Sequence, residues 1–204
     1  MDFSLTLLII IATAIVSVSA FSRPGIIDDL IFYPARMNGG KQLYRFVSHG
    51  LIHADVVHLL FNMLTLYFFG ELIEGYLTLW TGSKVVYLLF YFSAIVMASL
   101  PDYFRYRHQY HYRSLGASGG VSAVLFAYIL LAPWDKLLVW FIPMPAIAFA
   151  VLYVIYSIYM SRKGGDNINH RAHLWGALYG VAFVSIVKPQ VLQHFLNQLL
   201  NPPF

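Results

Sequence analysis

Six long apolar runs constrain this chain more than any other feature of its sequence. A helix needs about 17 to 25 apolar residues to cross the hydrocarbon core of a bilayer. Charged residues make up only 11% of the chain, whereas soluble domains contain roughly 25%. We therefore predict an all-α, polytopic membrane protein with six transmembrane helices in a single membrane-embedded domain over residues 1–204. The approximate bounds of the six runs are Ser4–Phe21, Ala54–Gly75, Lys84–Pro101, Gly116–Ala132, Leu137–Met160 and Ala172–Val187.

Three of these regions carry further signals. The first run has Val18 and Ala20 where a signal-peptide cleavage site would lie, but no Lys or Arg precedes it, so we expect a retained helix. Residues 22–53 mix apolar, aromatic and charged side chains, which is typical of a segment in the membrane interface. Pro143 and Pro145 each remove a helix hydrogen bond and should kink the fifth helix.

The basic residues are unevenly distributed between the two sides of the predicted bundle. The linkers after the first, third and fifth helices hold ten Lys and Arg residues, and the other side holds three. The positive-inside rule therefore places the linkers after the odd-numbered helices in the cytoplasm.

Composition also excludes several classes of function. The absence of cysteine rules out disulfides, thiolate metal sites and a cysteine nucleophile. The formal net charge of +4 is compatible with lipid headgroups near the loops, and no basic stripe indicates nucleic-acid binding.

Three polar clusters interrupt the apolar runs, and each lies at the amino end of an even-numbered helix. His58 and Asn62 begin the second helix, Ser118 begins the fourth among glycines, and His173 begins the sixth. Because successive helices alternate in direction, the clusters should share one side of the membrane and a similar depth. Polar side chains inside a bilayer are rare and suggest a functional site.

These side chains supply the groups needed for acyl transfer. Ser118 would attack a carbonyl, and His173 would take the proton and later donate it to the leaving amine. His58 and Asn62 lie four residues apart on one helix face. Together with the backbone N–H of Ser118 at a helix amino terminus, they could donate to the oxyanion.

Each cluster taken alone also has a simpler interpretation. Gly116 and Gly120 could only permit close helix packing. His49 and His53 have metal-ligand spacing but no completing carboxylate, and a haem held by His58 and His173 ranks far below catalysis. We therefore predict no metal and no cofactor. The coincidence of the three clusters is what favours an enzyme.

The motifs resemble those of rhomboid intramembrane serine proteases. The family pattern is a histidine followed by His-x-x-x-Asn, then G-x-S-G, then Ala-His with following glycines. The matching positions in this sequence are His53, His58–Asn62, Gly116–Gly119, Ala172–His173, Gly176 and Gly180. Tyr44–Arg45 resembles the aromatic-Arg pair of the family's first loop, and Glu74 resembles the acidic residue closing its second helix.

The resemblance implies a serine endopeptidase with a Ser118–His173 dyad and oxyanion positions at His58 and Asn62. It implies transmembrane protein substrates, membrane lipids as surroundings, and location in a bacterial plasma membrane. It also implies the topology opposite to that of the positive-inside rule. The alternative is a rhomboid-like pseudoprotease that binds transmembrane helices without cleaving them.

Two positions depart from the family pattern. Ser122 stands where an aromatic residue usually packs against the catalytic histidine, and Trp175 stands where a small residue is usual. Trp175 is a candidate for the missing aromatic support, although its helical spacing does not place it on the face of His173.

Overall fold

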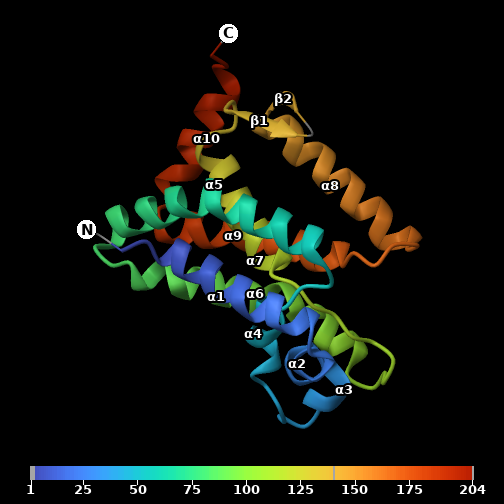
Figure 1. Cartoon of the computed structure of the whole chain (residues 1–204). Helices are drawn as coiled ribbons and strands as arrows, with labels where there is room; N and C mark the ends of the chain where they lie inside the picture. The colour runs from blue at the N-terminus through green and yellow to red at the C-terminus, as the bar shows by residue number, and fades with distance from the viewer. Residues whose placement is uncertain (1–2, 140, 204) are drawn as a thin grey trace.

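The computed structural model describes residues 3–139 and 141–203, and it is mostly helical (Figure 1). A β-hairpin is the exception among the described elements. In chain order these elements are α1 (Leu5–Phe21), α2 (Pro24–Leu30), α3 (Pro34–Met37), α4 (Arg45–Ser48), the 3-10 helix η1 (His49–Leu51), α5 (Val56–Thr81), α6 (Val85–Tyr106), α7 (Ser118–Leu131), β1 (Lys136–Val139), β2 (Ile142–Pro145), α8 (Ala146–Lys163), α9 (His170–Val187) and α10 (Gln190–Leu200).

Three of the described helices, α5, α6 and α8, are long and apolar enough to cross a membrane, and the bent pair α9 and α10 makes a fourth candidate. The prediction of a helical membrane protein is therefore confirmed. The count of six spanning helices is not, because α1 and α7 are shorter apolar helices. Helix α10, which bends 114° away from α9, was not among the predicted elements.

Helix α7 forms the centre of the bundle, packed against α5, α6 and α9. Eleven of its fourteen residues are buried, and few of its side chains are polar, so it has almost no face for water or lipid. Its amino end, where Ser118 lies, begins inside the protein (Figure 1).

The predicted start of the fifth helix was wrong. It was expected from Leu137 with kinks at two prolines, but α8 begins at Ala146. Residues Lys136–Val139 and Ile142–Pro145 instead form an antiparallel hairpin in which Leu138 pairs with Pro143. Proline has no N–H for a helix hydrogen bond, and a two-stranded ribbon, in which both strands are edges, tolerates it.

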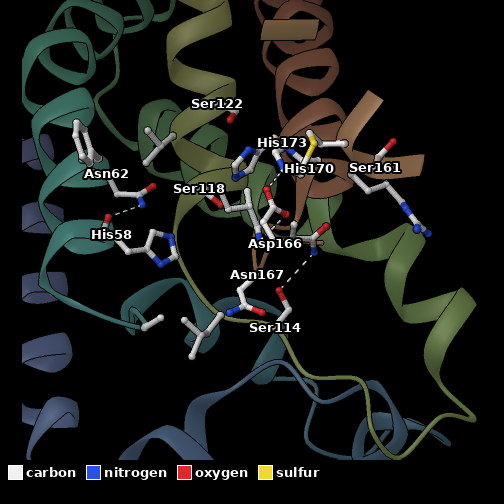
Figure 2. A pocket seen from close by; sticks show the side chains of 18 of the residues that line it. His58, Asn62, Ser114, Ser118, Ser122, Ser161, Asp166, Asn167, His170 and His173 are labelled. Atoms are coloured by element: carbon white, nitrogen blue, oxygen red, sulfur yellow. Dashed lines mark hydrogen bonds and ion pairs between the residues drawn. The ribbon is translucent and has the colours of Figure 1, made fainter. Parts of the chain in front are cut away.

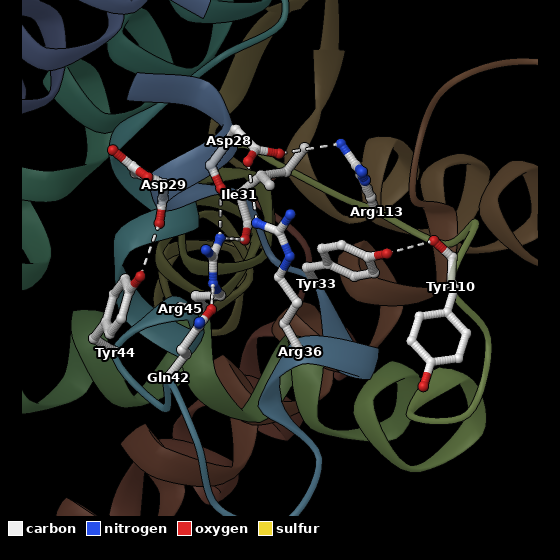
Figure 3. Close-up of polar contacts among 10 residues, drawn as sticks. All are labelled: Asp28, Asp29, Ile31, Tyr33, Arg36, Gln42, Tyr44, Arg45, Tyr110 and Arg113. Carbon is white, nitrogen blue, oxygen red and sulfur yellow. Dashed lines mark hydrogen bonds and ion pairs between the residues drawn. The ribbon is translucent and has the colours of Figure 1, made fainter. Parts of the chain in front are cut away.

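The segment between α1 and α5 is organised around a buried arginine. Arg45 is 2% exposed, and it donates to the Gln42 side chain and to the backbone carbonyls of Asp28 and Ile31 (Figure 3). The guanidinium therefore fastens α2 to α4. Nearby, Asp28 pairs with Arg36 at 3.1 Å and Arg113 at 3.3 Å.

Several of the basic residues that unbalance the charge count thus have specific partners. Arg45 is satisfied by carbonyl groups, and Arg36 and Arg113 share the Asp28 carboxylate and lie over the Tyr33 ring. Because their charges are engaged within the fold, they are weaker indicators of orientation than free loop charges.

Glu74 lies within α5 and caps another helix. The sequence analysis placed Glu74 at the end of the second helix, near Gly75, but α5 continues to Thr81. The buried Glu74 carboxylate accepts hydrogen bonds from the backbone N–H groups of Leu5 and Thr6 and from the Thr6 hydroxyl. A carboxylate at a helix amino terminus satisfies free N–H groups and complements the helix dipole, so Glu74 fixes α1 against α5.

Candidate active site

Helices α7 and α9 touch through their backbones beside the two predicted dyad residues. A Cβ atom added at Gly176 would lie 2.0 Å from the Gly119 carbonyl oxygen, and one added at Gly180 would lie 2.1 Å from that of Ala123. Such close approach requires glycine on the α9 side, because a Cβ at either position would collide with the α7 backbone. Gly119 follows Ser118, and Gly176 lies one turn after His173, so this contact sets both residues at one level of the bundle.

The four predicted site residues line one cavity of about 1120 Å³. Ser118 enters it from α7, His173 from α9, and His58 and Asn62 from α5, as Figure 2 shows. The structure thus brings together the three polar clusters that are separate in the sequence. The wall opposite α5 comes from α8, through residues such as Phe149 and Tyr153.

A histidine supports the loop before Ser118. Ser17 donates its hydroxyl hydrogen to the Leu51 carbonyl, so it accepts from Nδ1 of His53 at 2.9 Å. Nε2 of His53 then accepts the backbone N–H of Ala117 at 3.3 Å. These partners fit a neutral imidazole protonated at Nδ1, and burial lowers the pKa of His53 to about 3. Both ring nitrogens of His53 therefore support the loop through hydrogen bonds.

Gly116 makes room for the His58 ring. Its φ is +112°, a backbone conformation that side chains rarely adopt, and a Cβ there would lie 2.7 Å from Cε1 of His58. The Asn62 amide donates to the His58 backbone carbonyl at 2.9 Å and keeps a second N–H hydrogen. The His58 ring therefore lies directly against the loop that leads to Ser118.

His49 is also part of the scaffold. Its Nδ1 donates to the Arg45 carbonyl, its own carbonyl accepts from the Gly116 N–H, and its ring packs on Phe32. Burial lowers the pKa of His49 to about 4. No group of three or more His, Cys, Asp or Glu side chains in the described part of the chain could hold a metal ion.

The start of α9 is held by a polar network that sequence reasoning missed. Asn169 caps the helix by accepting the Ala172 N–H, and its amide donates to the buried Asp102 carboxylate at 2.7 Å. Tyr112 donates to the same carboxylate at 2.6 Å, and Arg171 lies 3.3 Å from it. An Asn three residues before the last apolar run was the available signal, since Asn is a preferred N-cap residue.

His170 pairs with a carboxylate that lines the same cavity. Its Nε2 lies 3.0 Å from the Asp166 carboxylate, and its ring meets the edge of the His173 ring at 5.9 Å. His170 is buried, and among the described residues its Nδ1 has no hydrogen-bond partner.

Ser122 and Trp175 occupy different surroundings. Ser122 is buried and hydrogen bonds to the Tyr153 hydroxyl of α8 at 2.7 Å. Trp175 is 44% exposed, so it does not provide aromatic support for His173. The ring stacked on His173 is that of Tyr153.

Comparison with known proteins decides the family. Residues 40–190 match the Rhomboid domain. The chain belongs to the rhomboid family. This match includes α4 to α9, which carry every residue of the predicted site.

Curated rhomboid relatives come from plants, bacteria and animals. The chain is 28% identical to the mitochondrial RHOMBOID-like protein 12 of Arabidopsis thaliana over 92% of its own length and 59% of the relative's. It is 28% identical to the rhomboid protease GlpG of Haemophilus influenzae over 77% of its length and 78% of GlpG. It is 28% identical to the rhomboid-related protein 1 of Caenorhabditis elegans over 88% of its length and 48% of the relative's. The chain thus spans between about half and four fifths of these relatives.

Proposed function

We propose that this rhomboid protein is an intramembrane serine endopeptidase that hydrolyses peptide bonds in or near transmembrane segments of membrane proteins. The observation that carries the proposal is the meeting of Ser118, His173, His58 and Asn62 on one cavity, beside the backbone contact of α7 with α9. The GlpG relative is by name a rhomboid protease. We also propose that α1, α5, α6, α7, α8 and α9 cross the membrane, since each lies within or over one of the six apolar runs.

In the proposed reaction Ser118 Oγ attacks the scissile carbonyl carbon while His173 takes the hydroxyl proton. The C–N bond then breaks, and His173 returns the proton to the leaving amine. Water then attacks the ester carbon while His173 takes its proton, the bond from that carbon to Ser118 Oγ breaks, and His173 returns the proton to Oγ. A dyad without a carboxylate is chemically sufficient, because the imidazole alone performs both proton transfers.

The oxyanion would be stabilised by groups from two helices. Helix α7 begins at Ser118, so the Ser118 N–H is among the first four that lack an intrahelical acceptor. His58 and the free amide hydrogen of Asn62 would donate from α5 across the cavity. Loss of one such donor typically lowers kcat about 100- to 1000-fold.

We further propose that the chain forms one domain in a bacterial plasma membrane, with the cavity open to the outer side. Bacterial proteins are among the relatives, as are mitochondrial ones. Immunolocalisation in the source cell tests this part separately from the chemistry.

The proposal is tested with purified protein and a transmembrane substrate in liposomes. We expect cleavage by the wild type and none by Ser118→Ala or His173→Ala. Ser161→Ala is the matched control, since Ser161 lines the same cavity but bonds to the Ile158 carbonyl, and it should cleave normally. Continued cleavage by Ser118→Ala would refute the assignment. A pseudoprotease would bind the substrate without labelling by a fluorophosphonate.

A further inference from the structure

Tyr153 of α8 lies over the imidazole of His173. The two ring centroids are 6.1 Å apart and the planes differ by only 21°. Both residues line the cavity that contains Ser118. The next aromatic residues along α8, Tyr156 and Tyr159, are more than half exposed, so Tyr153 is the one that faces His173.

The Tyr153 ring is held by contacts on several sides. Its hydroxyl hydrogen bonds to Ser122 Oγ of α7 at 2.7 Å. Phe126 of α7 and Phe149 of α8 pack against its ring, with centroid distances of 5.4 Å and 5.6 Å. A serine at 122 is small enough to leave this space for a ring from α8, and its hydroxyl satisfies the tyrosine hydroxyl. The ring is therefore anchored at the hydroxyl end and along its sides.

His173 depends on packing for its orientation. Within the described part of the chain no carboxylate pairs with its side chain, because Asp166 pairs with His170 instead. The titratable groups around His173 are His170 from its own helix, Asp166 from the preceding loop, Tyr153 from α8, and His58 on the α5 wall of the cavity. An imidazole that transfers protons must point at the serine oxygen, and a misplacement of about 1 Å can reduce the rate about 100-fold.

We infer that Tyr153 is a positioning residue for His173, and that the Ser122–Tyr153 hydrogen bond couples the place of α8 to the geometry of the dyad. The inference rests on the proposed protease function for its kinetic consequences, but the stacking itself does not. Only 17% of the apolar window of α8 is buried, so α8 is weakly held. A shift of α8 away from α7 would carry the ring off the imidazole and lower the reactivity of Ser118.

The experiment compares four single variants, which are Tyr153→Leu, Tyr153→Phe, Tyr153→Ser and Ser122→Ala. An exchange variant combines Ser122→Tyr with Tyr153→Ser and so moves the ring from α8 to α7. Tyr159→Leu is the control because Tyr159 is an exposed tyrosine of the same helix. Cleavage of a transmembrane substrate gives kcat and KM. The His173 Cε1–H signal, measured by NMR on protein with labelled histidine and assigned with His173→Gln, reports the ring current of Tyr153.

We expect Tyr153→Leu to lower kcat about tenfold, with KM unchanged, since this matches the strength of one aromatic contact. Tyr153→Phe and Ser122→Ala each remove the hydrogen bond and keep the ring, so both should lower kcat by the same factor and by less than Tyr153→Leu does; wild-type kcat in both would overturn the coupling through this bond. The exchange variant should regain activity relative to Tyr153→Ser alone. The His173 signal should change position in Tyr153→Leu and stay in place in Tyr159→Leu.

Wild-type kcat together with an unmoved His173 signal in Tyr153→Leu would overturn the inference. A wild type that neither cleaves nor reacts with a fluorophosphonate would overturn the proposed function alone, and the NMR signal would then decide the positioning role. If Tyr153→Leu does not fold, Tyr153→Met replaces it, because the longer unbranched side chain fills more of the space and has no ring.

Discussion

The contact between Gly176 and Gly119 gives a sharp test of how the dyad is assembled. Gly176→Ala adds a Cβ that would lie 2.0 Å from the Gly119 carbonyl oxygen. Ordinary contact begins at 3.4 Å, so α7 and α9 would have to separate by about 1.4 Å. The clash is with backbone atoms, which cannot rotate away as a side chain can. Overpacking of this kind destabilises a protein by about 1–3 kcal/mol.

The same separation would act on the proposed chemistry. Ser118 adjoins Gly119 and His173 lies one turn before Gly176, so the hydroxyl and the imidazole would move apart with the helices. We therefore expect Gly176→Ala to lower kcat about 100-fold and to lower the melting temperature measured in detergent. A fluorophosphonate labelling rate, measured well below the melting temperature, separates the altered geometry from unfolding.

Gly75→Ala is the matched control for this substitution. Gly75 lies inside α5, and a Cβ there would meet nothing within 4 Å. Because alanine favours a helix interior by about 1 kcal/mol over glycine, this variant should cleave normally with an equal or higher melting temperature. If Gly176→Ala kept wild-type labelling and melting temperature, the argument that glycine contact sets the dyad would be wrong.

Two further predictions concern residues outside the cavity. Glu74→Gln should destabilise the protein by about 1–3 kcal/mol, because an amide cannot replace both carboxylate oxygens at the start of α1. The control is Glu71→Gln, at an exposed position of the same helix, which should change the unfolding free energy by less than about 0.5 kcal/mol. Melting curves of the two variants side by side check this, and equal values would contradict the capping role. Burial lowers the pKa of His49 from 6.5 to about 4, so the unfolded chain binds a proton at a higher pH than the folded chain does. The stability contributed by neutral His49 should therefore be lost as the pH falls from 6.5 towards 4. His49→Gln should flatten that part of the curve of unfolding free energy against pH. His111→Gln, at an exposed position, is the control and should leave the curve unchanged.

Local sequence patterns predicted much of the fold and grouped the candidate site. The apolar runs indicated membrane helices because hydrocarbon leaves a spanning backbone few alternatives. The alternation of helix direction predicted that Ser118, His173 and the His58–Asn62 pair would share one side, and the structure brings them to one cavity. The same runs misplaced the start of α8, since Leu137–Pro145 is as apolar as a helix but contains two prolines in a hairpin.

The amino-acid sequence by itself determined the class of protein, its family and the set of side chains available for chemistry, because hydropathy and short motifs depend only on neighbouring residues. The tertiary structure alone decided which distant groups support them. The stacking of Tyr153 on His173, the capping of α1 by Glu74 and the fixing of Asn169 by Asp102 each join separate helices. No periodicity along one helix encodes such contacts, since they depend on how the helices rotate and approach one another when the core packs.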